Sequence, residues 1–230
     1  MLTLDKLLIH QGGFQLRADF QLAPGRKTAV IGPSGAGKST LLAALCGFVP
    51  LQGGRILWQD QDITDAPPAQ RPMAMLFQDN NLFPHLSVSQ NVGLGLRGDL
   101  RLDPKDQAAV AQALHRVGLT EHREARAATL SGGQQSRAAL ARVLVQHRPL
   151  IILDEPFAAL GPAMRYDMLD LVAALTQEQR ATLLVVTHAP DDVRRIADDV
   201  VFVADGLAQP PQPATQLLNN PPQALQAYLG

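Results

Sequence analysis

Hydrophobic and polar positions follow two different periods along this chain. Apolar and polar side chains alternate over residues 2–9 and 14–22, around Gly12 and Gly13, which predicts an antiparallel hairpin. Later, short apolar runs alternate with helix-length segments, which predicts a parallel sheet with chemistry at the carboxyl ends of its strands. Strands are predicted at 28–32, 56–59, 73–77, 150–153, 182–187 and 200–203, and helices at 39–47, from Pro162 and from Pro190.

The middle and the end of the chain break this alternation. From residue 86 to about 146 the pattern is helical, with Pro104 near the start of one helix, so we expect a helical subdomain at about 86–147. It interrupts a core formed by 1–85 and 148–208. Residues 209–230 are rich in Pro and Gln, which predicts a tail of short pieces. A chain of 230 residues, 46% hydrophobic, suits one α/β domain spanning 1–230 with this small subdomain.

Charge and cysteine content limit the kinds of partner and the compartment that we expect for this protein. The formal net charge is -1 with both signs mixed along the chain, so a nucleic-acid partner is not expected. The single Cys46 lies in an apolar run, where a buried thiol is expected. No apolar stretch approaches the roughly 18 residues of a membrane-spanning helix. Without a leader pattern at Met1, we expect a cytoplasmic protein whose membrane association depends on a partner.

The first candidate site follows the predicted strand at 28–32. Its sequence is GPSGAGKST, comprising Gly32, Pro33, Ser34, Gly35, Ala36, Gly37, Lys38, Ser39 and Thr40. Glycines let backbone N–H groups surround phosphate oxygens, and the following helix directs its positive end at the anion. Lys38 is expected on the β- and γ-phosphates and Ser39 on Mg²⁺. A glycine-rich turn is the alternative, but the flanking strand and helix favour phosphate binding.

Two carboxylates end the apolar run LIILDE. Asp154 suits a carboxylate that holds Mg²⁺ through water, and Glu155 can orient and polarise an attacking water. By itself, such a pair is only a charged strand end. Beside a phosphate loop, it predicts a catalytic site.

A third motif, LSGGQ, lies between the other two, with Ser131, Gly132, Gly133 and Gln134 where a helix is expected to begin. Ser131 can cap that helix, and the two glycines expose backbone N–H groups. Alone, it is a capped turn. In this order and spacing, the three motifs resemble the ATP-binding subunit of an ABC transporter over nearly the whole chain.

That resemblance implies an α/β fold: a P-loop NTPase core of ABC type, with an N-terminal antiparallel β region and an inserted helical subdomain. It also implies ATP hydrolysis with Mg²⁺ in a homodimer, in which residues 131–134 of each subunit grip the γ-phosphate bound by the other. By the same resemblance, Gln78 senses Mg²⁺ and water, and His188 contacts the γ-phosphate. An aromatic ring stacks on adenine, and both His10 and Phe14 are candidates.

This sequence departs from the family pattern at two positions. Gly161 stands where an Asp is usual, which affects a contact across the dimer, although Gly before Pro162 still starts a helix well. Ser136 replaces a second glutamine, with a modest effect expected.

Residues 75–83 and 92–96 resemble the ATP-binding subunits of bacterial thiamine importers. This implies uptake of thiamine or its phosphates, with membrane permease subunits and a periplasmic or extracellular solute-binding protein. The chain would then lie peripherally on the cytoplasmic face of the inner membrane. Leu82 and Phe83 form a candidate socket for a permease helix, or alternatively part of a core stripe.

Other functions stay open from sequence. The solute could be iron, a polyamine or an anion. A soluble ABC ATPase acting on DNA or ribosomes would need a long coiled coil or a second cassette, and the sequence has neither. A small-molecule kinase would leave LSGGQ unexplained.

Overall fold

The computed structural model describes residues 1–221, 225 and 226. Residues 222–224 and 227–230 of the predicted tail lie outside the described residues. The strands are β1 (Leu2–Gln11), β2 (Phe14–Leu22), β3 (Lys27–Ile31), β4 (Gly53–Trp58), β5 (Gln61–Asp62), β6 (Met73–Leu76), β7 (Leu150–Asp154), β8 (Thr182–Val186), β9 (Asp199–Ala204), β10 (Leu207–Ala208) and β11 (Gln212–Pro213). The α-helices are α1 (Lys38–Leu45), α2 (Val88–Gly93), α3 (Pro104–Arg116), α4 (Gly132–Leu144), α5 (Pro162–Glu178), α6 (Pro190–Ile196) and α7 (Ala214–Asn219).

The predicted N-terminal hairpin is confirmed. β1 and β2 pair antiparallel from Leu2 opposite Leu22 to Gln11 opposite Phe14. Gly12 and Gly13, with φ of 54° and 86°, make the turn in conformations that suit glycine. Buried and open side chains alternate along β2, as half-buried strands require.

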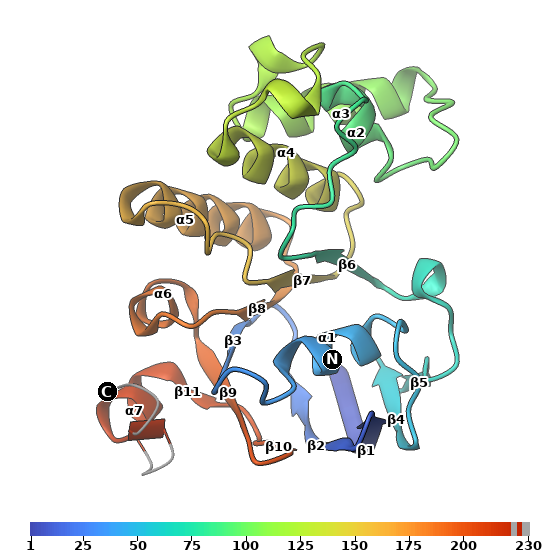
Figure 1. The fold of residues 1–230 in the computed structure, drawn as a ribbon. Coiled ribbons are helices and arrows are strands. Elements are labelled where there is room, and N and C mark those ends of the chain that lie inside the picture. Colours follow the sequence, from blue (N-terminus) through green and yellow to red (C-terminus); the bar gives the residue numbers. More distant parts are fainter. Residues whose placement is uncertain (222–224, 227–230) are drawn as a thin grey trace.

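The predicted parallel sheet is also confirmed, and it continues into the hairpin. Strands β9, β3, β8, β7 and β6 lie side by side in parallel. β10 pairs with both β2 and β9, so one sheet has the order β5-β4-β1-β2-β10-β9-β3-β8-β7-β6, with β11 on β9 (Figure 1). This join was not predicted, because two-residue strands carry no periodic signal. The carboxyl ends of β3, β7 and β8 consequently lie together.

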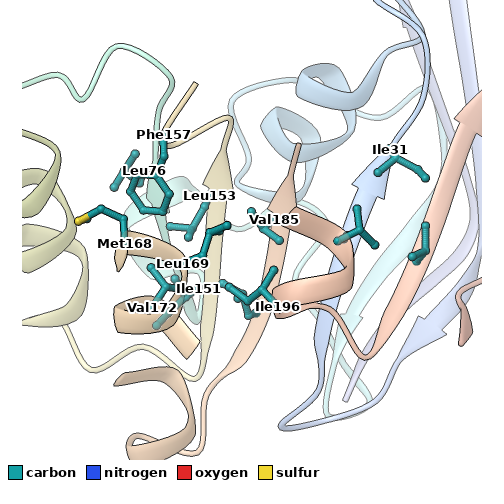
Figure 2. Close-up of a cluster of buried hydrophobic side chains, with 14 of the residues drawn as sticks. Ile31, Leu76, Ile151, Leu153, Phe157, Met168, Leu169, Val172, Val185 and Ile196 are labelled. Carbon is teal, nitrogen blue, oxygen red and sulfur yellow. The ribbon is translucent and has the colours of Figure 1, made fainter. Parts of the chain in front are cut away.

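Helices α5 and α6 cover one face of the parallel strands. Figure 2 shows Ile151 and Val185 of the sheet packed near Val172 of α5 and Ile196 of α6. Each fully buried side chain of this kind stabilises the fold by roughly 1.5–3 kcal/mol relative to exposure. This packing fixes the strand ends from which the candidate site is built.

The helices between β6 and β7 have a core of their own (Figure 1, top). α3 begins with Pro104 at its first position, and Asp103 caps it through a bond from the Asp106 backbone N–H. Val92, Leu114 and Ala141 of α2, α3 and α4 are buried against one another. These helices fall within the predicted segment 86–147. Among the described residues, no helix has the length and apolar character needed to cross a membrane.

Cys46 is buried at 4% exposure, as predicted. Burial raises the pKa of its thiol to about 12. Since only the thiolate is nucleophilic, we expect iodoacetamide at pH 8 to label the native protein roughly a thousandfold more slowly than the denatured protein. Mass spectrometry of timed samples measures this, and equal native and denatured rates would contradict it.

Candidate functional site

The phosphate loop connects β3 to α1 through two tightly placed glycines. A Cβ on Gly32 would lie 2.0 Å from the backbone oxygen of Val203, so only glycine fits there. Gly37 is the N-cap of α1 with φ of 96°, and a Cβ on it would lie 2.5 Å from the Phe14 ring. Glycine is therefore required at positions 32 and 37 by close contacts with β9 and β2, as well as by the conformation of the loop itself.

Lys38 folds back along the loop. Its Nζ donates hydrogen bonds to the backbone oxygens of Gly32 at 2.8 Å and Pro33 at 2.9 Å. The residue is 5% exposed. Burial lowers the pKa of Lys38, while the charges of Glu155 and Asp154 oppose that shift. A partly desolvated ammonium held by carbonyl groups is well placed to exchange them for phosphate oxygens.

Asp154 ends β7 directly opposite the start of α1. Its Oδ1 accepts a hydrogen bond from Ser39 Oγ at 3.3 Å, across 115 positions of sequence. Burial raises the pKa of Asp154, and the Ser39 hydrogen bond partly opposes this. Two of the three residues predicted at the metal, Ser39 and Asp154, are thus in contact. A buried carboxylate beside a hydroxyl is an oxygen donor set that suits Mg²⁺.

Glu155 and His188 meet at the ends of β7 and β8. His188 Nε2 contacts Glu155 Oε1. Glu155 has φ of 45°, a strained conformation for a side chain of this type, and its backbone N–H donates to Val186 O at 3.2 Å. Such strain often occurs at functional sites because the surrounding structure enforces it.

Lys38, Ser39, Glu155 and His188 border one cavity of about 540 Å³, whereas Asp154 lies behind Ser39 and is not part of the lining. Gln78 lines the cavity from the loop after β6. Phe14 lines it as well, whereas His10 is exposed on β1 and is not among the lining residues. The lining is Gln11, Phe14, Ser34, Gly35, Gly37, Lys38, Ser39, Thr40, Gln78, Glu155 and His188. Sequence reasoning missed Gln11, which has no motif around it.

The LSGGQ turn lies apart from that cavity, and none of residues 131–134 lines it in the described structure. Ser131 caps α4: its Oγ accepts from the Gln134 backbone N–H, and Gln134 Oε1 accepts from the Ser131 N–H at 2.9 Å. This reciprocal capping box leaves Ser131 and Gly132 exposed. A Cβ on Gly133 would lie 2.2 Å from Met164 Sδ on α5.

Both departures from the family pattern fit the fold. Gly161 caps α5 without a side-chain hydrogen bond, and Pro162 occupies the first helical position, as expected. Ser136 is 3% exposed, and its Oγ lies 3.5 Å from Asn80 Nδ2, in the loop after Gln78.

Comparison with known proteins decides the family. The model of the ABC transporter family matches residues 16–158. This chain belongs to the ABC transporter family. It is an ABC-type ATPase, as the three motifs indicated.

Relatives extend the match of this ABC ATPase to the full chain. The thiamine import ATP-binding protein ThiQ of Ruegeria sp. (strain TM1040) is 56% identical over 230 residues, covering 100% of both chains. ThiQ of Cereibacter sphaeroides is 55% identical with the same coverage.

Solved structures confirm the predicted ABC-type fold. A nucleotide-free ATP-binding cassette from an ABC transporter has a TM-score of 0.89 at 23% identity, covering 100% of this ABC ATPase and 99% of that chain. A dimeric cassette in a post-hydrolysis state, bound to ADP and Pi, has a TM-score of 0.80 at 25% identity, covering 93% and 99%.

Proposed function

We propose that this chain is the ATP-hydrolysing subunit of an importer for thiamine or its phosphates. The observation that carries the proposal is a single cavity bordered by Lys38, Ser39, Glu155 and His188, in a chain 56% identical to a thiamine import ATP-binding protein over its full length. The cavity supports ATP chemistry, and the relatives support the solute.

In this proposal, the loop at 32–40 holds the phosphates. Its backbone N–H groups and the positive end of α1 face the anion, and Lys38 leaves the carbonyls of Gly32 and Pro33 to contact the β- and γ-phosphates. Phe14 is the candidate for adenine stacking because it borders the cavity and His10 does not.

Ser39 and Asp154 would hold Mg²⁺, and Gln78 lines the same cavity as Ser39. Their contact at 3.3 Å brings together the hydroxyl and carboxylate oxygens that this ion prefers. When bound, the ion neutralises charge on the phosphate oxygens.

Glu155 would orient and polarise the attacking water. Its carboxylate borders the cavity beside His188, which is placed to contact the γ-phosphate. Because phosphoryl transfer needs mainly positioning and charge stabilisation, the fixed strand ends are suited to the reaction.

The site would be completed by a second copy of the chain. The exposed Ser131 and Gly132 lie away from the cavity of their own chain, while a related cassette is dimeric with ADP and Pi. In a twofold dimer, the turn at 131–134 of each subunit would face the phosphate of the other. ATP bound at such an interface drives association by mass action.

Permease subunits would dock on a groove of about 590 Å³ beside Gln78. It is bordered by Phe77, Leu82, Phe83 and Leu94, among others. Phe83 is 47% exposed, whereas Leu82 packs partly into the core. The two predicted socket residues therefore differ, and Phe83 is the more accessible of them. Such docking would place the chain peripherally on the cytoplasmic face of the inner membrane, with a solute-binding protein on the other side.

Phe83→Asp is expected to abolish copurification with the permease, because a charge in an apolar contact is costly to bury. The control is Leu207→Asp, which changes an equally exposed apolar residue (47%) on β10. Affinity purification of the coexpressed complex measures this. Retention of the permease by the Phe83 variant would place the docking surface elsewhere.

The solute is tested by reconstituting the chain with its permease and solute-binding protein in vesicles. Thiamine should stimulate ATP hydrolysis and accumulate with ATP, while iron, spermidine and sulfate should not. Accumulation of one of these instead would overturn the thiamine assignment but leave the ATPase assignment intact.

A further inference from the structure

A group of buried, hydrogen-bonded polar side chains lies next to His188. Thr187 Oγ1 donates to Asp192 Oδ2 at 2.7 Å, and the same Thr187 oxygen accepts the Ala189 backbone N–H at 3.1 Å. Thr187 is 7% exposed and Asp192 is 5% exposed. The residues on both sides of His188 are therefore fixed through one hydroxyl group.

Arg165 links this group to the loop that follows Glu155. Its Nε lies 3.1 Å from Asp192 Oδ1, and its backbone N–H donates to Gly161 O at 2.9 Å. Residues 156–161 lead into α5, where Arg165 lies in the first turn, and Asp192 lies in the first turn of α6, after the β8 loop. The ion pair therefore joins the helix starts that follow the two loops. Within the described residues, Arg165 Nε and Asp192 Oδ1 are buried and neither has a hydrogen-bond partner, so their contact is an ion pair.

A cavity of about 270 Å³ lies on this side of the Glu155–His188 contact. It is bordered by Glu155, His188, Arg165 and Asp192 and by apolar residues of β8 and α5. Because side chains do not fill this space, apolar packing alone does not fix the two loops. Directional hydrogen bonds and the ion pair must hold their geometry.

We propose that Thr187, Asp192 and Arg165 are positioning residues that orient His188 toward the γ-phosphate and couple it to residues 156–161. A buried charge is strongly disfavoured without its partner, so Arg165 and Asp192 stay together when either loop moves. Movement of residues 156–161 in the dimer then shifts His188. This inference rests on the role proposed for His188.

The test compares Thr187→Val with Thr187→Ser. Valine has nearly the shape of threonine but can neither donate to Asp192 nor accept from Ala189, whereas serine keeps the hydroxyl. For Thr187→Val we expect kcat for ATP hydrolysis to fall roughly 10- to 100-fold, since small displacements of a reacting group have effects of this size. KM for ATP should stay within about threefold, and Thr187→Ser should stay within about threefold of wild type in both constants.

The same substitution in a His188→Ala background separates positioning from general damage. If Thr187 acts through His188, Thr187→Val should cause no further loss of kcat there. An equal loss in both backgrounds, or wild-type kcat for Thr187→Val, would overturn the inference. If thermal unfolding shows that Thr187→Val is not folded, Arg165→Gln is tested in its place with the same criteria. Arg165 is the partly exposed member of this group of polar side chains.

The outcomes also separate this inference from the proposed function. A large loss in His188→Ala with normal Thr187→Val overturns the positioning role alone. Normal turnover in His188→Ala overturns both the proposed role of His188 and the inference built on it.

Discussion

Glu155→Gln is expected to lower ATP turnover roughly 1,000-fold, because an amide cannot polarise the attacking water as a carboxylate does. The amide keeps the shape of the side chain and can still contact His188. ATP binding should therefore survive, and ATP should now hold the subunits together as a long-lived dimer. Steady-state phosphate release and size-exclusion chromatography with ATP measure the two effects.

The matched control is Glu121→Gln, the same change at an exposed residue of the helical region. It should hydrolyse ATP at the wild-type rate and show no ATP-stabilised dimer. Unchanged turnover in Glu155→Gln would falsify the role assigned to this carboxylate and direct attention to another group at the cavity.

Ser131→Arg should abolish both ATP-driven pairing and turnover, with a fall in kcat of roughly 100-fold or more, as for loss of a charge-stabilising contact. The large side chain removes the capping hydroxyl and would occupy the space of the partner's γ-phosphate. Binding of ATP to the monomer should change little, because residue 131 does not border its own chain's cavity. ATP binding by calorimetry and ATP-dependent dimerisation by light scattering separate these effects.

Gln112→Arg, which places the same side chain at an exposed position of α3, is the control. It should retain pairing and turnover. If Ser131→Arg also retains both, the shared-site proposal is wrong and each chain completes its own phosphate site.

The motifs could be predicted from sequence because their chemistry is local. Gly37, Lys38 and Ser39 are consecutive, so the backbone of the proposed phosphate loop and the helix behind it are specified by neighbouring residues. The capping box of Ser131 and Gln134 likewise spans one helical turn. Strand and helix positions followed from side-chain periodicity, which the burial pattern of β2 confirms.

Contacts between distant segments required the tertiary structure. Ser39 reaches Asp154 across 115 positions, and no pattern in the sequence gives that distance. The sequence does not distinguish Phe14 from His10 as the aromatic candidate, whereas in the structure Phe14 lies against Gly37 and lines the cavity. Leu82 and Phe83 are adjacent, yet only Phe83 is largely exposed, because the side chain of Leu82 packs against the core.

By itself, the sequence determined the main strands and helices and the place of the glycine-rich turn between β3 and α1, because those depend on residues within a few positions of one another. The tertiary structure alone decided which segments become neighbours: the joining of the hairpin to the parallel strands through β10, and the meeting of Thr187, Asp192 and Arg165 behind His188. Periodicity tells which face of an element is buried, but the partner of that face is set by packing of the whole chain.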